Sequence, residues 1–215
     1  MTLTLEARWF GSSPIPTALR EWFDTLGSVQ TSTQNDLYLP ADDPTLNVKL
    51  RDDQLQIKRR LAGPFRQTLG PSATAHCEQW VKWKFGDERE RPSLWEKDPT
   101  DLWVLVQKTR HQCTIDAEAQ SSLAPDLPTA PVASIEVELT ALDVDSESAW
   151  TFCLEAEGPA SNLGETLTTA GPVLLDERLP VVLSSDQSFG YVRWLQQLPG
   201  VSTSPAPEIR VSGLK

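Results

Sequence analysis

The sequence predicts a mainly β protein of the α+β class: a closed antiparallel barrel, or tunnel, of about eight strands with a few covering helices. Three observations predict this fold. Much of the chain divides into short segments in which apolar and polar residues alternate with a period of two, as in half-buried strands. Seven of these segments carry two charged residues spaced two apart. Helical spacing of apolar residues is confined to a few stretches, and one barrel of 215 residues is of ordinary size.

The first half of the chain is expected to supply most of the strands. The first strand covers residues 2–10 (TLTLEARWF), after which Pro16 can open a helix over Thr17–Leu26. A short strand at Asp36–Leu39 leads into a hairpin over Thr45–Leu61, whose two halves both alternate. Two longer strands follow at Cys77–Phe85 and Leu102–Ile115.

Connections are expected where glycine and proline punctuate the chain. Gly63-Pro64 and Gly70-Pro71 mark a loop between the hairpin and the next strand. The charged run 86–101 and the Ser/Ala/Pro-rich run 117–131 are both expected to be exposed.

The second half alternates in the same way and then becomes helical. Strands are expected at Ala133–Leu142, Ala149–Glu157 and, briefly, Val181–Leu183; helices are expected at Asn162–Ala170, with Ser161 as the N-cap, and at Ser185–Leu198, packed on the body of the protein. We therefore expect a single domain over residues 1–198 and a C-terminal tail over residues 199–215.

Charge and cysteine usage limit the classes of function. The protein is acidic, with a formal net charge of −11, and the whole excess lies in residues 111–215. An acidic outer surface argues against binding nucleic acid or anionic membranes, but it allows a small anionic ligand in a local basic pocket. The three cysteines are odd in number, lack C-x-x-C spacing and suit a reducing compartment. With no apolar signal-peptide core or membrane span, we expect a soluble, cytoplasmic protein.

The paired charges are the candidate site. They are Glu6/Arg8, Lys49/Arg51, Lys58/Arg60, Lys82/Lys84, Lys108/Arg110, Glu136/Glu138 and Glu155/Glu157. In a strand, this spacing aims both side chains at the same face, so closing the sheet can turn all seven pairs into one lumen. Nine cations and five carboxylates in a lumen would suit a polyphosphate, with glutamates at one end holding Mg²⁺ or Mn²⁺.

A solvent-exposed sheet face is the alternative explanation, because charge at alternate positions is also typical of a solvated surface. Surface charge normally mixes signs within a strand, however. Here four successive pairs are purely basic and two later pairs are purely acidic. The segregation therefore favours a shared cavity.

These motifs resemble the CYTH superfamily of triphosphate tunnel enzymes, over roughly residues 2–198. The resemblance is carried by Glu6 and Arg8, Asp36-Leu37-Tyr38-Leu39, Lys49-Leu50-Arg51, Lys58-Arg59-Arg60, Glu136-Val137-Glu138 and Glu155-Ala156-Glu157, in the family's order. It implies a metal-dependent triphosphatase with Glu6 and Arg8 as catalytic residues. By the resemblance, substrate would be bound by Lys49, Arg51, Lys58, Lys108 and Arg110, and metal by Glu138, Glu155 and Glu157, with Glu6 nearby. The pattern of paired charges adds Arg60, Lys82 and Lys84 to the expected substrate-binding residues.

Two departures from the family's E-x-E-x-K motif keep other functions open. Thr4 stands where the motif has its first glutamate, and Arg8 stands where it has lysine. Arginine keeps the charge but cannot serve as a base. Two hypotheses therefore stay open: a triphosphatase acting on inorganic or organic triphosphate, and a non-catalytic polyphosphate-binding or scaffold protein. The eight tryptophans raise a third alternative, a lipocalin-like carrier of an apolar ligand with the charged pairs outside.

Overall fold

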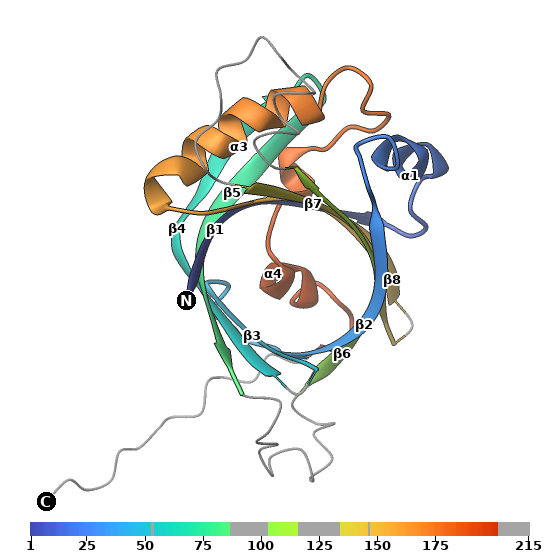
Figure 1. Ribbon diagram of the computed structural model, residues 1–215. Helices are drawn as coiled ribbons and strands as arrows, with labels where there is room; N and C mark the ends of the chain where they lie inside the picture. Colours follow the sequence, from blue (N-terminus) through green and yellow to red (C-terminus); the bar gives the residue numbers. More distant parts are fainter. Residues whose placement is uncertain (53, 87–102, 116–133, 146, 202–215) are drawn as a thin grey trace, which may run out of the picture.

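The computed structural model describes residues 1–52, 54–86, 103–115, 134–145 and 147–201 (Figure 1). Its strands are β1 (Thr2–Ser12), β2 (Gln30–Leu39), β3 (Leu46–Arg51), β4 (Gln54–Gly70), β5 (Ala73–Phe85), β6 (Val104–Ile115), β7 (Ser134–Val144) and β8 (Glu147–Glu157). Its helices are α1 (Thr17–Phe23), α3 (Ala160–Leu174), the 3₁₀ turn η2 (Ser185–Gln187) and α4 (Tyr191–Leu195).

The eight strands close into an antiparallel barrel in the order β1-β5-β4-β3-β2-β6-β7-β8. Closure depends on β1, which pairs with β5 on one side and with β8 on the other. At the opposite side of the ring, β6 joins β2 to β7. The predicted closed barrel and its mainly β class are confirmed.

One apolar core lies outside the barrel wall, under α1 and α3 (Figure 1). The outward face of β1 contributes Trp9, and that of β8 contributes Phe152; both are fully buried. Phe152 packs 6.0 Å from Trp9, 5.9 Å from Trp22 and 6.4 Å from Phe23, measured between ring centroids. This core fixes α1 against the wall.

A second apolar core lies inside the barrel, because α4 sits within the ring of strands (Figure 1). Its members from the strands are Phe10, Tyr38, Val106, Leu142 and Val144, and its members from α4 are Tyr191, Trp194 and Leu195. The prediction of one helix over Ser185–Leu198 on the outside of the body was wrong in extent. The segment forms a 3₁₀ turn, enters the barrel and then forms a short helix.

The loop expected at Gly63-Pro64 was also wrong, because β4 runs through this dipeptide; at Gly70-Pro71 the strand ends and the chain turns into β5. The pairing of β4 with β5 changes register between Arg60 and Ala62, between Ala62 and Phe65, and between Thr68 and Gly70. Such bulges let a strand contain residues that would otherwise interrupt it. Gly63 has a φ of 95° within this irregular stretch. At Gly70, a Cβ atom would lie 2.0 Å from the carbonyl oxygen of Leu175, so only glycine fits where the end of α3 meets β4.

Smaller differences concern helix ends and termini. Helix α3 begins at Ala160 after Pro159, without the side-chain cap expected from Ser161. Val181–Leu183 forms an isolated bridge rather than a strand. The expected connections at 87–101 and 117–131, and the tail from 202, lie outside the described residues. No helix in the described ranges is long and apolar enough to cross a membrane.

Replacing Phe152 by alanine is expected to lower the free energy of unfolding by about 3–5 kcal/mol, because it leaves a cavity among three aromatic rings. Urea denaturation followed by tryptophan fluorescence measures this. The control is Val182→Ala, at a side chain that is 72% exposed, where the loss should stay within about 0.5 kcal/mol. Equal losses in both variants would contradict the packing described for β8.

Candidate binding site in the barrel lumen

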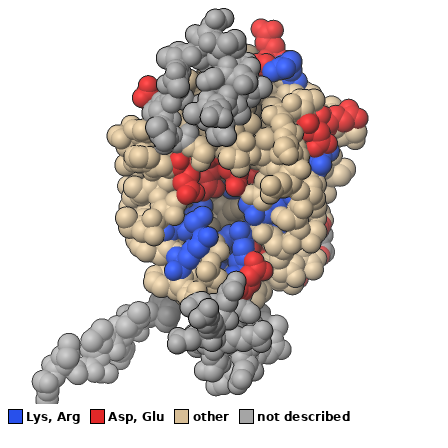
Figure 2. All heavy atoms as spheres, viewed as in Figure 1, with Lys and Arg blue, Asp and Glu red and all other residues tan. Residues whose placement is uncertain are grey.

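Twelve of the fourteen paired charges line a cavity of about 290 Å³ inside the barrel. Seven lysines and arginines and five glutamates contribute to its lining, an excess of only two positive charges. Figure 2 shows acidic and basic atoms on opposite sides of the hollow. The segregation follows from strand order: the glutamate-rich strands β7 and β8 are neighbours, and the basic strands β3, β4 and β5 are neighbours in another part of the ring.

Most of the predicted site residues lie together in this cavity. They are Glu6, Arg8, Lys49, Arg51, Lys58, Lys82, Lys108, Arg110, Glu138, Glu155 and Glu157. Two predicted residues lie apart from them. Arg60 forms an ion pair with Glu78 beside a separate cavity of about 130 Å³, and Lys84 is exposed.

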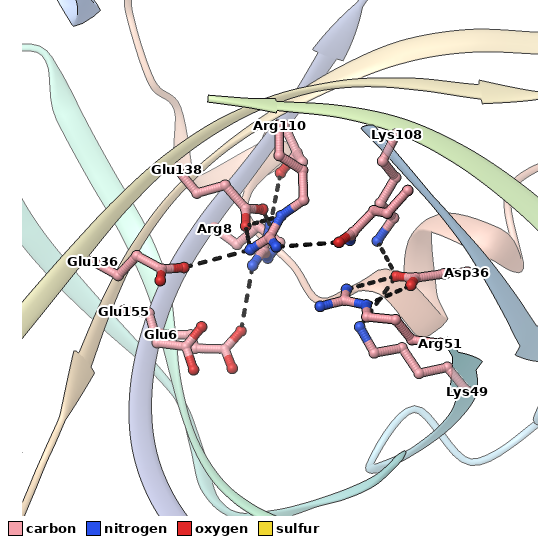
Figure 3. Close-up of polar contacts among 12 residues, drawn as sticks. Glu6, Arg8, Asp36, Lys49, Arg51, Lys108, Arg110, Glu136, Glu138 and Glu155 are labelled. Carbon is pink, nitrogen blue, oxygen red and sulfur yellow. Dashed lines mark hydrogen bonds and ion pairs between the residues drawn. The ribbon is translucent and has the colours of Figure 1, made fainter. Parts of the chain in front are cut away.

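Asp36 of β2 is the centre of a basic cluster on one wall (Figure 3). Its carboxylate accepts hydrogen bonds from Arg51 at 2.6 and 2.8 Å and from Lys49 at 3.1 Å, and Lys108 Nζ lies 2.8 Å away. The carboxyl group is fully buried. Burial alone raises the pKa of Asp36, but Arg51, Lys108 and Lys49 outweigh it and hold that pKa well below its ordinary value.

Lys108 is buried between this cluster and two tyrosine rings. Its Nζ donates to the Tyr38 hydroxyl at 2.8 Å and lies 3.9 Å from the centre of the Tyr191 ring. Burial lowers the pKa of Lys108 to about 7, although Asp36 opposes the shift. An added anion near Lys108 would favour its charged form.

A second cluster joins Arg8 and Arg110 through Glu138 (Figure 3). Arg8 Nη1 donates to Glu138 Oε1 at 3.2 Å, and Arg110 donates to Glu138 Oε2 from Nε at 2.8 Å and also from Nη2. Burial raises the pKa of Glu138, but the two arginines outweigh it and lower that pKa strongly. Glu138 therefore remains ionised.

The third cluster is a glutamate pair that shares Lys58. Glu6 of β1 and Glu155 of β8 are cross-strand partners, and Lys58 Nζ lies 2.5 Å from Glu6 and 3.6 Å from Glu155. Burial raises the pKa of both carboxyls. For Glu6, Lys58 and Arg8 outweigh burial and lower the pKa; for Glu155, burial prevails and the pKa is raised. Two adjacent carboxyls thus differ in proton affinity.

Sequence reasoning missed four residues of the site. Asp36 and Tyr38 lie two positions apart on β2, so the same period-two rule could have placed them in the lumen. Trp80 shares the lumen face with Lys82, and it also lines the cavity. Tyr191 had no strand signal, because it reaches the lumen from α4.

As arranged, Glu138 and Glu6 are not free to hold a divalent cation. Both oxygens of Glu138 bond arginines, and Glu6 bonds Lys58 and accepts a further hydrogen bond from Thr4 at 3.3 Å. Ammonium and guanidinium groups beside these carboxylates would repel a metal ion. Within the described ranges, no group of three or more His, Cys, Asp or Glu is placed to hold a metal.

The charged lumen also decides against the lipocalin-like alternative. That alternative required an apolar interior with the charged pairs facing outward. Eleven of the predicted charged residues line the interior instead, so the prediction of an apolar carrier was wrong. Neighbouring cations that share carboxylates can exchange them for the oxygens of another anion.

Fold and site together define a closed barrel with a charged lumen, the tunnel architecture that the CYTH resemblance implies. No protein-family model and no curated protein sequence matches the chain. Solved structures similar to it include a putative adenylyl cyclase from Hippeastrum described as having a dominant triphosphatase activity, with 12% identity, coverage of 78% of this chain and 84% of that one, and a TM-score of 0.32.

Two further similar structures are the PH1012 protein from Pyrococcus horikoshii and a chain of the Schizosaccharomyces pombe Mediator head module. The first has 14% identity, coverage of 87% and 98%, and a TM-score of 0.40. The second has 10% identity, coverage of 77% and 90%, and a TM-score of 0.39. Such low scores carry no argument about function, and the barrel is defined by its own strand pairing.

Asp36→Asn is expected to lower the free energy of unfolding by about 3–5 kcal/mol at neutral pH, because it leaves buried cations without a counter-charge. The pKa of Asp36 is depressed in the folded state, so its contribution is complete above the unfolded value of about 3.9 and is lost as pH falls from there towards the folded pKa. The free energy of unfolding should therefore fall less at acid pH in the variant than in the native protein. Urea denaturation at a series of pH values measures both effects.

Asp43→Asn is the matched control. Asp43 pairs with Arg59 on the surface, where both side chains are 48% exposed, and the expected loss is within about 1 kcal/mol. If Asp36→Asn cost no more than Asp43→Asn, the buried cluster would not be what stabilises this wall.

Proposed function

We propose that the lumen binds a triphosphate, either inorganic triphosphate or the triphosphate group of an organic molecule. The single observation that supports this most is the convergence of cations from four basic strands on one cavity: Lys49 and Arg51, Lys58, Lys82, and Lys108 and Arg110. Lysine and arginine bind phosphate oxygens through charge-assisted hydrogen bonds, and arginine can do so through two N–H groups at once. The cavity volume lies near the lower end of the range for small-molecule sites.

Binding requires exchange of partners, because the lumen cations already hold carboxylates. Oxygens of the bound phosphates would replace Asp36, Glu138 or Glu6 at one or more cations. Lys82 is available without exchange, as it has no ion pair with another described residue.

Lys82→Gln is expected to weaken tripolyphosphate binding by about 10- to 100-fold, the loss of one charge-assisted hydrogen bond. Isothermal titration calorimetry measures the affinity. Arg59→Gln removes a cation from the outer face of β4, where the side chain is 48% exposed, and should leave binding unchanged. If the native protein did not bind tripolyphosphate measurably, the proposal would be refuted. If both variants lost affinity equally, binding would have to occur outside the lumen.

A second candidate function is hydrolysis of the bound triphosphate. It is favoured by the opposite pKa shifts of Glu6 and Glu155, which are adjacent on the cavity wall. A carboxylate of raised pKa is the stronger base, so Glu155 would orient and deprotonate the attacking water, while Arg8, Lys58 and their neighbours neutralise the developing charge. The requirement for Mg²⁺ or Mn²⁺ inferred from the family resemblance stays a prediction.

Glu155→Gln is expected to reduce phosphate release from tripolyphosphate at least about 100-fold, with less effect on binding. In the native protein, the rate should fall at acid pH, with a midpoint above the ordinary glutamate value of 4.5. Rates are measured with EDTA, with Mg²⁺ and with Mn²⁺. Glu165→Gln, on the exposed side of α3, is the control and should leave the rate of phosphate release unchanged. If the protein binds tripolyphosphate but releases no phosphate under any of these conditions, hydrolysis is excluded and the protein is a non-catalytic polyphosphate-binding protein.

A further inference from the structure

A second cavity lies on the outer side of the barrel wall, beside helix α3 (Figure 1). Its volume is about 330 Å³, against about 290 Å³ for the charged lumen. Strands β1 and β5 contribute Leu5 and Cys77 to its lining, and α3 contributes Leu163 and Gly164. Along β1, Leu5 alternates with Glu6, which lines the lumen. The two cavities therefore lie on opposite faces of the same wall.

The outer cavity differs from the lumen in its chemistry. Among the described residues that line it, none is charged. Its walls are apolar: Leu163 and Leu167 are buried, and Cys77 is 3% exposed. Its polar groups include the side-chain amides of Gln67 and Gln79, each with both a donor and an acceptor. An apolar cavity with a few polar groups that can fix orientation is typical of a small-molecule site.

The space at Gly164 is not explained by the packing of the chain on itself. A Cβ atom added there would meet no other atom within 4 Å. Glycine inside a helix costs stability relative to alanine, and at this position no close approach requires it. At Gly171 of the same helix, by contrast, a Cβ would lie 3.0 Å from Leu69 Cδ2, so packing explains that glycine. The open space beside Gly164 leaves room for a ligand.

A bulge in β4 brings an aromatic ring to the cavity. The pairing of β4 with β5 changes register between Ala62 and Phe65, and bulges of this kind redirect side chains. Phe65 lines the cavity, yet its side chain is 54% exposed. A half-exposed phenyl ring beside an apolar cavity offers a surface on which another ring can stack.

The two amides lie on either side of this ring. Phe65 and Cys77 are cross-strand partners. Gln67 lies two residues beyond Phe65 on β4, and Gln79 lies two residues beyond Cys77 on β5. Because β4 and β5 are antiparallel, these steps run in opposite directions along the same face. A molecule lying over the pair of Phe65 and Cys77 therefore has an amide towards each end.

We propose that this outer cavity binds an uncharged aromatic molecule, stacked on Phe65 and exchanging hydrogen bonds with the amides of Gln67 and Gln79. The uncharged lining selects an uncharged ligand, because a charge moved into an apolar cavity without a partner loses its hydration. A ring is favoured over an aliphatic chain, since aromatic pairs gain energy beyond the burial of their surface. The site is separate from the lumen, and it does not depend on the proposed binding of triphosphate.

The test uses the full chain and two fluorescent probes that share one ring system: neutral N-phenyl-1-naphthylamine and its sulfonated analogue 1-anilinonaphthalene-8-sulfonate. The neutral probe should bind saturably, at one molecule per protein. Gly164→Leu fills the open space and should weaken this binding at least about 10-fold. The sulfonated probe should bind this Gly164-sensitive site at least about 10-fold more weakly than the neutral probe.

Two control variants separate filling of the cavity from other effects on α3. Gly164→Ala changes the helix in the same way but keeps most of the volume, so affinity should stay within about 3-fold of the native value. Ser161→Leu adds the same leucine at an exposed position outside the lining and should leave affinity unchanged. Circular dichroism checks that all three variants are folded.

Three results would overturn the inference. The first is the absence of saturable binding of the neutral probe, or equal affinity in the native protein and Gly164→Leu. The second is equal affinity of the two probes for the Gly164-sensitive site, which would contradict an uncharged ligand. The third is a native dimer that Gly164→Leu dissociates in sedimentation velocity experiments, because a second copy of the chain would then fill the cavity.

Discussion

The structure depends on neutralisation of charge inside a closed barrel. An isolated charge placed in such an interior costs several kcal/mol, and the barrel holds seven cations around one cavity. The cost is tolerated because carboxylates from other strands share these cations: Asp36 takes three, and Glu138 takes two. Because the partners come from different strands, the ion pairs form only when these strands come together in the sheet.

The same neutralisation shapes what the site can do. A lumen in which five glutamates and Asp36 offset seven lysines and arginines attracts an anion less strongly than the number of its lysines and arginines suggests. Affinity then depends on how well phosphate oxygens replace carboxylate oxygens, which is a matter of geometry. Arg51 holds Asp36 through two N–H groups, and this is also how arginine holds a phosphate.

The period-two pattern predicted the strands and the inward direction of the charged pairs because both follow from local backbone geometry. It failed where tertiary context overrides local signals. The Gly63-Pro64 dipeptide reads as a loop, yet register shifts accommodate it within β4, which pairs with β5 and is covered by α3. Arg60 shares the inward face with Lys58, but the irregular stretch after it directs it to Glu78.

The position of α4 inside the barrel could not be predicted from its own sequence, for a different reason. A short helix with apolar and aromatic residues packs equally well on the outside of a barrel or inside it, and its own sequence does not distinguish the two. The distinction lies in residues far away: Phe10, Leu142 and Val144 are apolar at positions where the strand pattern, continued from Arg8 and Glu138, would have kept the lumen polar. Apolar residues on the inward face therefore identify where a barrel is filled by its own chain.

Strand order also explains why β1 carries both signs of charge. It is the only strand that lies between the basic strand β5 and the acidic strand β8. From this border position, Glu6 can share Lys58 with Glu155, and Arg8 can reach Glu138 across β8. An uncharged Thr4 at the next inward position, fully buried and donating to Glu6, limits the carboxylates at this border to those that Lys58 and Arg8 can neutralise. The departure from E-x-E-x-K is thus consistent with a lumen balanced by its own cations.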